Sequence, residues 1–232
     1  MDFLENNFFY LILLLFTLSY PLLQSFERRI KYYTKWKSLF KGIFFMMCLF
    51  IPWYIIFTSK GIWGFNHKFI LEIPPFLFLP LEEWLFFIIV PFACVFIYEV
   101  LNYFFPVSKK HDYINNFLFI KSVLLLVLSF IFHDKTYTAI CFSLASFFTY
   151  FLYLLEPSTL FKIYRAYLVT FFPFVLINGF LTGSFSSEPV VWYNDLYNLG
   201  IRFLNIPIED FVYNFLMLSM VLFFNGKSLK KV

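Results

Sequence analysis

Charged residues are scarce in this chain of 232 residues. They make up 14% of the sequence, against 61% hydrophobic residues, whereas roughly a quarter of the residues in a soluble domain are charged. The composition predicts a membrane protein, and no segment of about 100 residues is left for a separate soluble catalytic domain. Basic loops explain the net charge of +4, so we expect contacts with membrane lipids and no nucleic-acid partner.

Histidine and cysteine are also scarce, with three of each. Cys48, Cys94 and Cys141 lie in separate apolar runs without ligand-like spacing, which argues against a disulfide framework or a metal site. No pair of histidines lies within the apolar runs, so a membrane cytochrome is not expected. A Gly-x-Gly-x-x-Gly pattern is absent too. We therefore expect no metal and no other cofactor.

Seven apolar stretches are long enough to cross about 30 Å of hydrocarbon as helices. They lie at residues 7–26, 39–58, 82–105, 115–132, 137–155, 165–183 and 209–225. This pattern predicts an all-α fold, a polytopic membrane bundle of about seven transmembrane helices. The last stretch holds no lysine that could bind retinal, which excludes a retinylidene protein.

Basic residues gather on one side of these stretches. If the N-terminus is outside, all but four of the 18 lysines and arginines lie on the inner side, the exceptions being Lys60, Lys68, Lys135 and Arg202. Such a bias agrees with the positive-inside rule. We expect an integral protein of a bacterial cell (inner) membrane, with its N-terminus outside and its C-terminus in the cytoplasm.

An internal repeat relates two halves of the chain at a spacing of about 127 residues. Leu79–Leu85 reads Leu-Pro-Leu-Glu-Glu-Trp-Leu, and Ile206–Val212 reads Ile-Pro-Ile-Glu-Asp-Phe-Val. A linking span between the halves would make them parallel. We predict two parallel three-helix repeats, residues 1–106 and 135–232, joined by a transmembrane helix within 107–134.

Each copy opens an apolar helix with two acids, Glu82 and Glu83 in the first and Glu209 and Asp210 in the second. Carboxylates after proline are common at ordinary helix starts, but two matched pairs in a chain with only 14 acids favour function. Neighbouring helical residues point about 100° apart, so one acid of each pair would face the bundle while the other supports it. Crowding near apolar surroundings favours at least one protonated acid, which is a proton donor.

A bundle with small loops admits its substrate from the lipid, which favours an isoprenoid or another hydrocarbon. Protonation of a carbon–carbon double bond makes a carbocation, and aromatic faces and negative charge stabilise it. Aromatic residues near the acids could do this, although Trp and Tyr also gather at membrane interfaces. The candidate substrate-binding residues are Trp63, Asn66, Trp84, Asn178, Trp192, Tyr193, Asn194 and Phe211.

Five segments carry a more specific signal, namely Gly61–Asn66, Pro80–Glu83, Asn178–Gly183, Pro189–Tyr193 and Pro207–Asp210. Together they resemble the integral-membrane lycopene cyclases. These enzymes occur as two small subunits in some actinobacteria, as one fused chain elsewhere, and as the cyclase half of fungal bifunctional enzymes. The resemblance covers nearly the whole chain, so the sequence looks like the fused form.

The resemblance implies a lycopene beta-cyclase, an intramolecular lyase of the isomerase class. Such an enzyme converts the ψ ends of lycopene to β-ionone rings, giving γ-carotene and then β-carotene without redox change. An acid would protonate the terminal double bond, the neighbouring alkene would attack the cation, and a base would remove a proton. We predict Glu82 and Glu209 as donor and acceptor, tuned by Glu83 and by Asp210, which replaces the second Glu of the family's Pro-x-Glu-Glu motif. Other enzymes of the carotenoid pathway are expected partners.

Two other functions stay open. A membrane prenyltransferase would carry two Asp-rich magnesium motifs, and Asn194–Asn198 is a poor match to one of them. A proton-coupled transporter would carry acids near the membrane midplane on broken helices, whereas these acids lie at helix starts and glycine is scarce, with 7 in all. The sequence leaves open β against ε rings, C40 against C50 substrates, one ring against two, and the oligomeric state.

Overall fold

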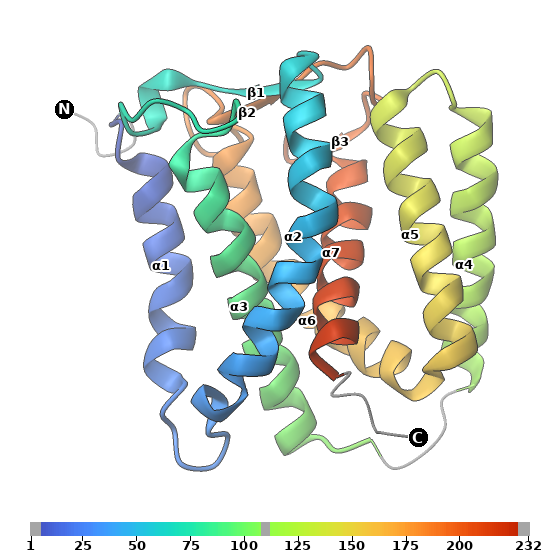
Figure 1. Cartoon of the computed structure of the whole chain (residues 1–232). Coiled ribbons are helices and arrows are strands. Elements are labelled where there is room, and N and C mark those ends of the chain that lie inside the picture. Colours follow the sequence, from blue (N-terminus) through green and yellow to red (C-terminus); the bar gives the residue numbers. More distant parts are fainter. Residues whose placement is uncertain (1–5, 108–111, 227–232) are drawn as a thin grey trace.

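The computed structural model describes residues 6–107 and 112–226 of the chain. Within them, seven α-helices form a bundle (Figure 1). Their bounds are Phe9–Gln24 (α1), Trp36–Ser59 (α2), Leu81–Phe104 (α3), Asp112–Ile131 (α4), Thr136–Leu155 (α5), Pro157–Leu181 (α6) and Ile208–Gly226 (α7). Two single turns of 3₁₀ helix, Tyr32–Lys35 and His67–Phe69, lie in the connections before α2 and α3.

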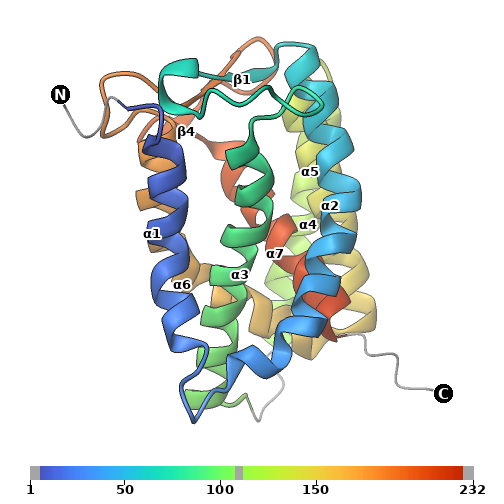
Figure 2. The ribbon, with the colours of Figure 1, turned by 60° about the vertical axis from the view of Figure 1, so that its left-hand side comes forward.

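Six of these helices are long and apolar enough to cross a membrane. The exception is α1, whose 16 residues extend about 24 Å, less than the roughly 30 Å of a hydrocarbon core. It is also apolar, and it packs against α3 and α6 (Figure 2). The chain is therefore an all-α polytopic membrane protein, as its composition predicts.

Helix bounds match the predicted stretches to within a few residues, except in α6. We predicted residues 165–183, but α6 already begins at Pro157, because proline favours the first helical position and one of the two charged residues near its start, Arg165, finds partners. Arg165 donates to the side chain of Asn102 at 2.8 Å and to the carbonyl oxygen of Phe105. A hydropathy pattern cannot show that such a charge is satisfied.

The helices of the two halves pack in matching ways around α3 and α7. In the first half α1 packs on α3, and in the second half α5 packs on α7. Helices also pack across the two halves, because α2 of the first half packs on α7 and α6 of the second half packs on α3. Helix α4 lies outside, against α5 (Figure 1). The halves thus share one core, and the division at 1–106, 107–134 and 135–232 stays a proposal about repeats of the chain.

Two short antiparallel strand pairs lie at the end of the bundle where α3 and α7 begin (Figure 1). Strand β1 (Trp63–Phe65) pairs with β2 (Val191–Tyr193), and β3 (Arg202–Phe203) pairs with β4 (Ile206–Pro207). We did not predict these strands, since two or three residues are too few to show a period of two. The first pair joins the connection of one repeat to that of the other.

The pairing of β1 with β2 is itself two-fold in pattern. Gly64 lies opposite Trp192. On one side the backbone amide of Asn66 donates to the Val190 carbonyl at 2.8 Å, and on the other the backbone amide of Asn194 donates to the Ile62 carbonyl at 2.9 Å. A Cβ on Gly64 would lie 2.4 Å from the Trp192 ring, so a larger residue here would require that ring to move. The repeat thus has a matching backbone geometry, centred above the helix starts.

Candidate active site

Both acid pairs are buried at the starts of α3 and α7, at the same end of the bundle (Figure 1). The exposed fractions are 0% for Glu82, 2% for Glu83, 0% for Glu209 and 4% for Asp210. Buried carboxyl groups are costly unless they are hydrogen-bonded, so their partners indicate how each acid is used.

The first acid of each pair binds the backbone of a loop. The Leu71 amide donates to Oε1 of Glu82 at 2.7 Å, and the Leu199 amide donates to Oε1 of Glu209 at 2.9 Å. Glu209 also accepts from the Thr138 hydroxyl at 2.5 Å. Glu82 and Glu209 therefore tie the connections that precede α3 and α7 to the helix starts.

The second acid of each pair binds a tyrosine from another helix. The Tyr10 hydroxyl of α1 donates to Oε2 of Glu83 at 2.7 Å, and the Tyr137 hydroxyl of α5 donates to Oδ1 of Asp210 at 2.6 Å. Both tyrosines lie 73 residues before the acids that they contact, so the two hydrogen bonds join equivalent positions of the two repeats. As helical geometry predicts, the two acids of a pair point to different surroundings.

Asp210 has further donors that belong to the second repeat alone. Its Oδ2 accepts from the Tyr193 hydroxyl at 2.8 Å and from the Asn178 amide at 3.0 Å. Burial, together with the neighbouring Asp210 carboxylate, raises the pKa of Tyr193 well above its ordinary value, so its hydroxyl stays a donor. In the first repeat the strand position that corresponds to Tyr193 is Phe65, which has no hydroxyl. The two halves of the site are therefore unequal.

Aromatic rings surround the second acids. The buried Trp63 ring lies 4.6 Å from Tyr54 and 5.1 Å from Tyr137, between ring centroids. The rings of Tyr137 and Tyr193 are stacked at 6.2 Å. Tyr54 interacts with Glu83, and Glu83 in turn lies close enough to Asp210 for the two carboxyl groups to interact electrostatically. The two repeats thus meet in one cluster of acids and aromatic rings.

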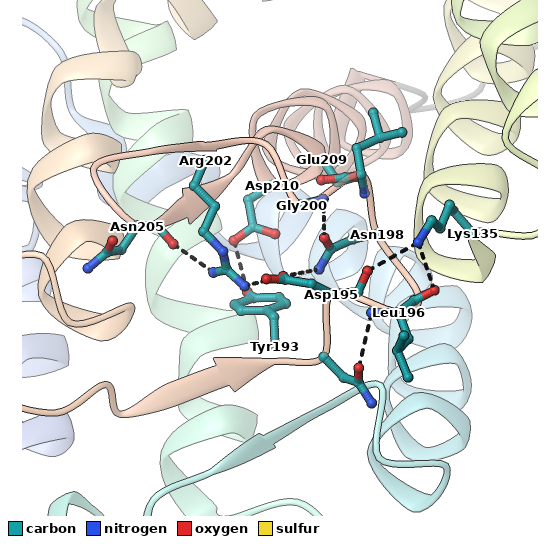
Figure 3. Close-up of polar contacts among 12 residues, drawn as sticks. Lys135, Tyr193, Asp195, Leu196, Asn198, Gly200, Arg202, Asn205, Glu209 and Asp210 are labelled. Carbon is teal, nitrogen blue, oxygen red and sulfur yellow. Dashed lines mark hydrogen bonds and ion pairs between the residues drawn. The ribbon is translucent and has the colours of Figure 1, made fainter.

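The loop between β2 and β3 runs beside Tyr193 and Asp210 (Figure 3). The Arg202 guanidinium pairs with the Asp195 carboxylate at 2.5 Å and lies 5.8 Å from the centroid of the Tyr193 ring. Asn198 also donates to Asp195, at 3.2 Å. Arg202 thus stabilises the loop and contacts Tyr193 rather than the acids. This pairing of Asp195 disfavours the magnesium–diphosphate site that a prenyltransferase needs.

Three of the predicted substrate-binding residues lie within the cluster, namely Trp63, Asn178 and Tyr193. The other five lie at its margins. Asn66 donates to Glu188, Asn194 accepts from the Leu196 amide, and Trp192 is 42% exposed above Gly64. The ring of Trp84 packs against Phe76 in the preceding loop, and Phe211 packs against Phe171 and Phe174 of α6.

Sequence reasoning missed the tyrosines that hold the second acids. Tyr10 and Tyr137 lie at the same spacing of about 127 residues as the acids themselves, so the repeat could have identified them. Tyr54 has no comparable signal, because only the packing of α2 brings it to Glu83.

Comparison with known proteins agrees with this arrangement. A family model described as "Lycopene cyclase" matches residues 7–101 and 134–225. The matched segments coincide with the two repeats, and the gap between them encloses α4. No curated protein and no solved structure matches the chain.

Proposed function

We propose that this chain, which belongs to the lycopene cyclase family, converts the ψ end groups of lycopene to β-ionone rings by acid-initiated cyclisation. The observation that carries the proposal is the pair of buried acids, Glu83 and Asp210, one from each repeat, each of which accepts a hydrogen bond from a tyrosine hydroxyl. In this reaction a proton is added and another is lost, so the enzyme would be an isomerase of the intramolecular lyase kind.

Glu83 is the proposed proton donor. Tyr10 donates to its Oε2, so a proton on this carboxyl group would lie on Oε1. Glu83 is buried, and burial in apolar surroundings disfavours the charged form of a carboxyl group. Transfer of the Oε1 proton to the terminal double bond leaves a tertiary cation, and the electron pair of the nearby alkene then closes the ring.

Asp210 is the proposed proton acceptor. Its two oxygens accept three hydrogen bonds, from Tyr137, Tyr193 and Asn178, and donors to a carboxylate stabilise its charged form. A fixed negative charge also stabilises the cation formed by ring closure. Asp210 then takes a ring proton, which leaves the ring double bond, and return of that proton to Glu83 restores the starting state.

The aromatic rings support the same chemistry. A cation within about 6 Å of an aromatic ring is attracted by the electrons on its face. Trp63, Tyr54 and Tyr193 present such rings next to the acids. Their burial also keeps water from a cation that it would otherwise trap as an alcohol.

This assignment reverses the roles that we predicted from the sequence. Glu82 and Glu209 were the predicted donor and acceptor, but loop amides of Leu71 and Leu199 occupy one oxygen of each. We now assign them the task of holding the loops over the cluster. Their position one residue before the inward-facing acids supports this role.

Replacement of each acid by its amide tests the assignment. The variants Glu83→Gln and Asp210→Asn should lower cyclisation in a lycopene-accumulating bacterial host by about 100-fold or more, the usual effect of losing a general acid or base. Glu82→Gln and Glu209→Gln are the matched controls. Each keeps the oxygen that accepts the loop amide, so the loss should stay below about tenfold.

Pigment analysis by chromatography measures the result, with the amount of protein in the membrane determined for every variant. No cyclic carotenoid from the wild-type protein at normal membrane levels would refute the function. Greater losses in the two control variants than in Glu83→Gln and Asp210→Asn would instead favour Glu82 and Glu209 as proton donor and acceptor.

Several finer properties belong to the same proposal. The product would be γ-carotene and then β-carotene, and the substrate is a lipid-soluble carotenoid that enters from the membrane. We place the protein in the inner membrane of a bacterial cell, with its N-terminus outside, on the basis of its lysine and arginine distribution. Other carotenoid-pathway enzymes are the proposed partners, since each would exchange water-insoluble intermediates with this one.

A further inference from the structure

An apolar cavity of about 320 Å³ lies between α1, α3 and α6. Along α3 it extends from Phe86 to Ile97, about 16 Å at 1.5 Å per residue. Phe16 and Tyr20 of α1 line it on one side and are 65% and 64% exposed at the outer surface of the bundle. The cavity is therefore a long, narrow space that opens beside α1 at the outer surface of the bundle.

Besides residues with hydroxyl groups, two asparagines line this cavity. The amide of Asn178 donates to Oδ2 of Asp210 at 3.0 Å, so this residue connects the cavity to the acid cluster. Asn214 enters from α7, one helical turn after Asp210. The cavity thus ends beside the carboxylate to which we assign the acceptor role.

The side chain of Asn214 is 1% exposed. Neither its amide nitrogen nor its oxygen has a hydrogen-bonding partner among the described residues, 6–107 and 112–226. A buried amide without partners is costly, and such groups in native proteins call for an explanation. Its amide oxygen is the negative end of a dipole, which suits a positively charged intermediate in the cavity.

The corresponding positions of the second repeat carry larger, buried side chains. At the repeat spacing, Val90 and Ala93 on the cavity wall correspond to Met217 and Met220 of α7, which are 1% and 7% exposed. Asn214 itself corresponds to Phe87 of α3, which is fully buried. At these three positions the second repeat thus differs from the first in side-chain size or polarity.

We propose, building on the proposed cyclase function, that this cavity binds one linear end of the carotenoid, and that the Asn214 amide oxygen faces and stabilises the cation formed there. The hydrocarbon enters past Phe16 and Tyr20, and the remainder of the molecule stays in the lipid. Because the matching positions of the second repeat carry larger, buried side chains, each binding event closes one ring. A second ring requires release of the monocyclic product and binding of its other end.

The variant Ala93→Met tests the binding site by placing the side chain of the second repeat in the first. It should lower lycopene conversion by at least about tenfold, since overfilling of a packed space excludes a ligand or forces strain. Ile89→Met is the matched control, because Ile89 is buried in α3 but does not line the cavity. Ala93→Met with wild-type conversion at equal membrane levels would overturn the proposal.

A second variant keeps the test decisive if Ala93→Met is poorly produced. Thr17→Leu copies Leu144, the corresponding residue of the second repeat, and the Thr17 hydroxyl donates to the carbonyl of Leu13 in its own helix. It should likewise lower conversion, and unchanged conversion would contradict the proposal. The amount of lycopene retained by the purified protein distinguishes failure of the cavity proposal from failure of the proposed cyclase function. Retention by wild type and not by Ala93→Met, without cyclisation by either, would support the cavity while refuting the cyclase function.

Asn214→Leu tests the polar end of the cavity. Lycopene retention should stay near the wild-type amount while turnover of bound lycopene falls by at least about tenfold. Asn214→Asp, which keeps an oxygen at the same place, should recover part of the turnover. Wild-type turnover in Asn214→Leu would overturn the role of this residue.

A pulse–chase experiment tests the closure of one ring at a time. Purified protein loaded with isotope-labelled lycopene is mixed with a large excess of unlabelled lycopene as the reaction begins. Label should collect in the monocyclic product, because that product must leave before its other end reacts. Label that passes directly into the bicyclic product would refute the one-end mechanism.

Discussion

Replacement of the two repeat-related tyrosines should reveal that the two acids do different work. Tyr10 and Tyr137 occupy matching positions, and each donates one hydrogen bond to the inward-facing acid of its own repeat, at 2.7 and 2.6 Å. Phenylalanine at either place removes a hydroxyl group and keeps the ring. If Glu83 is neutral and Asp210 is charged before the reaction, Tyr137→Phe should be the more damaging change.

The two kinds of hydrogen bond set the expected difference. A bond to a charged group contributes about 1.5–3 kcal/mol and one between neutral groups about 0.5–1.5 kcal/mol. At about 1.36 kcal/mol per factor of ten in rate, Tyr137→Phe should slow cyclisation by about 13- to 160-fold. Tyr10→Phe should slow it by about 2- to 13-fold. Tyr193 and Asn178 still donate to Asp210 in the first variant, which favours the lower half of its range.

Single-turnover cyclisation of bound lycopene, followed by the colour change from the linear to the cyclic carotenoid, measures this ratio directly. Both variants should be extracted from membranes in wild-type amounts and retain lycopene, so that folding and binding do not enter the comparison. An effect of Tyr10→Phe equal to or larger than that of Tyr137→Phe would refute the assignment of Glu83 as donor and Asp210 as acceptor.

Two further changes test the architecture around the site. Gly64→Ala should lower the thermal stability of the purified protein, because the added Cβ would lie 2.4 Å from the Trp192 ring, and a second change, Trp192→Ala, should restore it; an unaffected single variant would contradict the close approach. Hydrogen bonds from the Lys68 ammonium and the Asn66 amide lower the pKa of Glu188, so the stabilising charge is present above the unfolded pKa and is lost as the pH falls through the folded one. Glu188→Gln should therefore be slightly less stable than wild type at neutral pH, and the difference should shrink below about pH 4; a difference that grows in acid would refute this account. Cyclisation by Glu188→Gln should match wild type, since Glu188 contacts the loops and not the acids.

Hydropathy predicted the fold because each helix of a membrane bundle must satisfy its backbone within itself and present an apolar surface. Six helices of the required length and the shorter α1 follow from that rule. The rule does not cover charged residues inside a helix, and there the predicted start of the helix was less accurate. The first turns of α6 contain Lys162 and Arg165, and only the contact of Arg165 with α3 and the segment after it shows why the helix can begin at Pro157.

The repeat led to the acids, and the same spacing applies to Tyr10 and Tyr137. It could not rank the acids within a pair. Adjacent helical residues point about 100° apart, so one faces the interior, but which one depends on how the helix is rotated. The loop amide of Leu71 binds Glu82, while Tyr10 binds Glu83; neither contact is visible in a pattern of residue types.

The sequence by itself determined that the protein belongs in a membrane, because charged residues are too few for a soluble domain. Its internal repeat also showed that four of the 14 acids form two matched pairs. Only the tertiary structure decided which acid of each pair binds a tyrosine from another helix, and that a cavity lies along α3. The physical reason is that packing depends on helix rotation and side-chain volume. Ala93 and Met220 occupy corresponding positions in the chain, but only the three-dimensional packing shows that the first lines a cavity and that the second is buried.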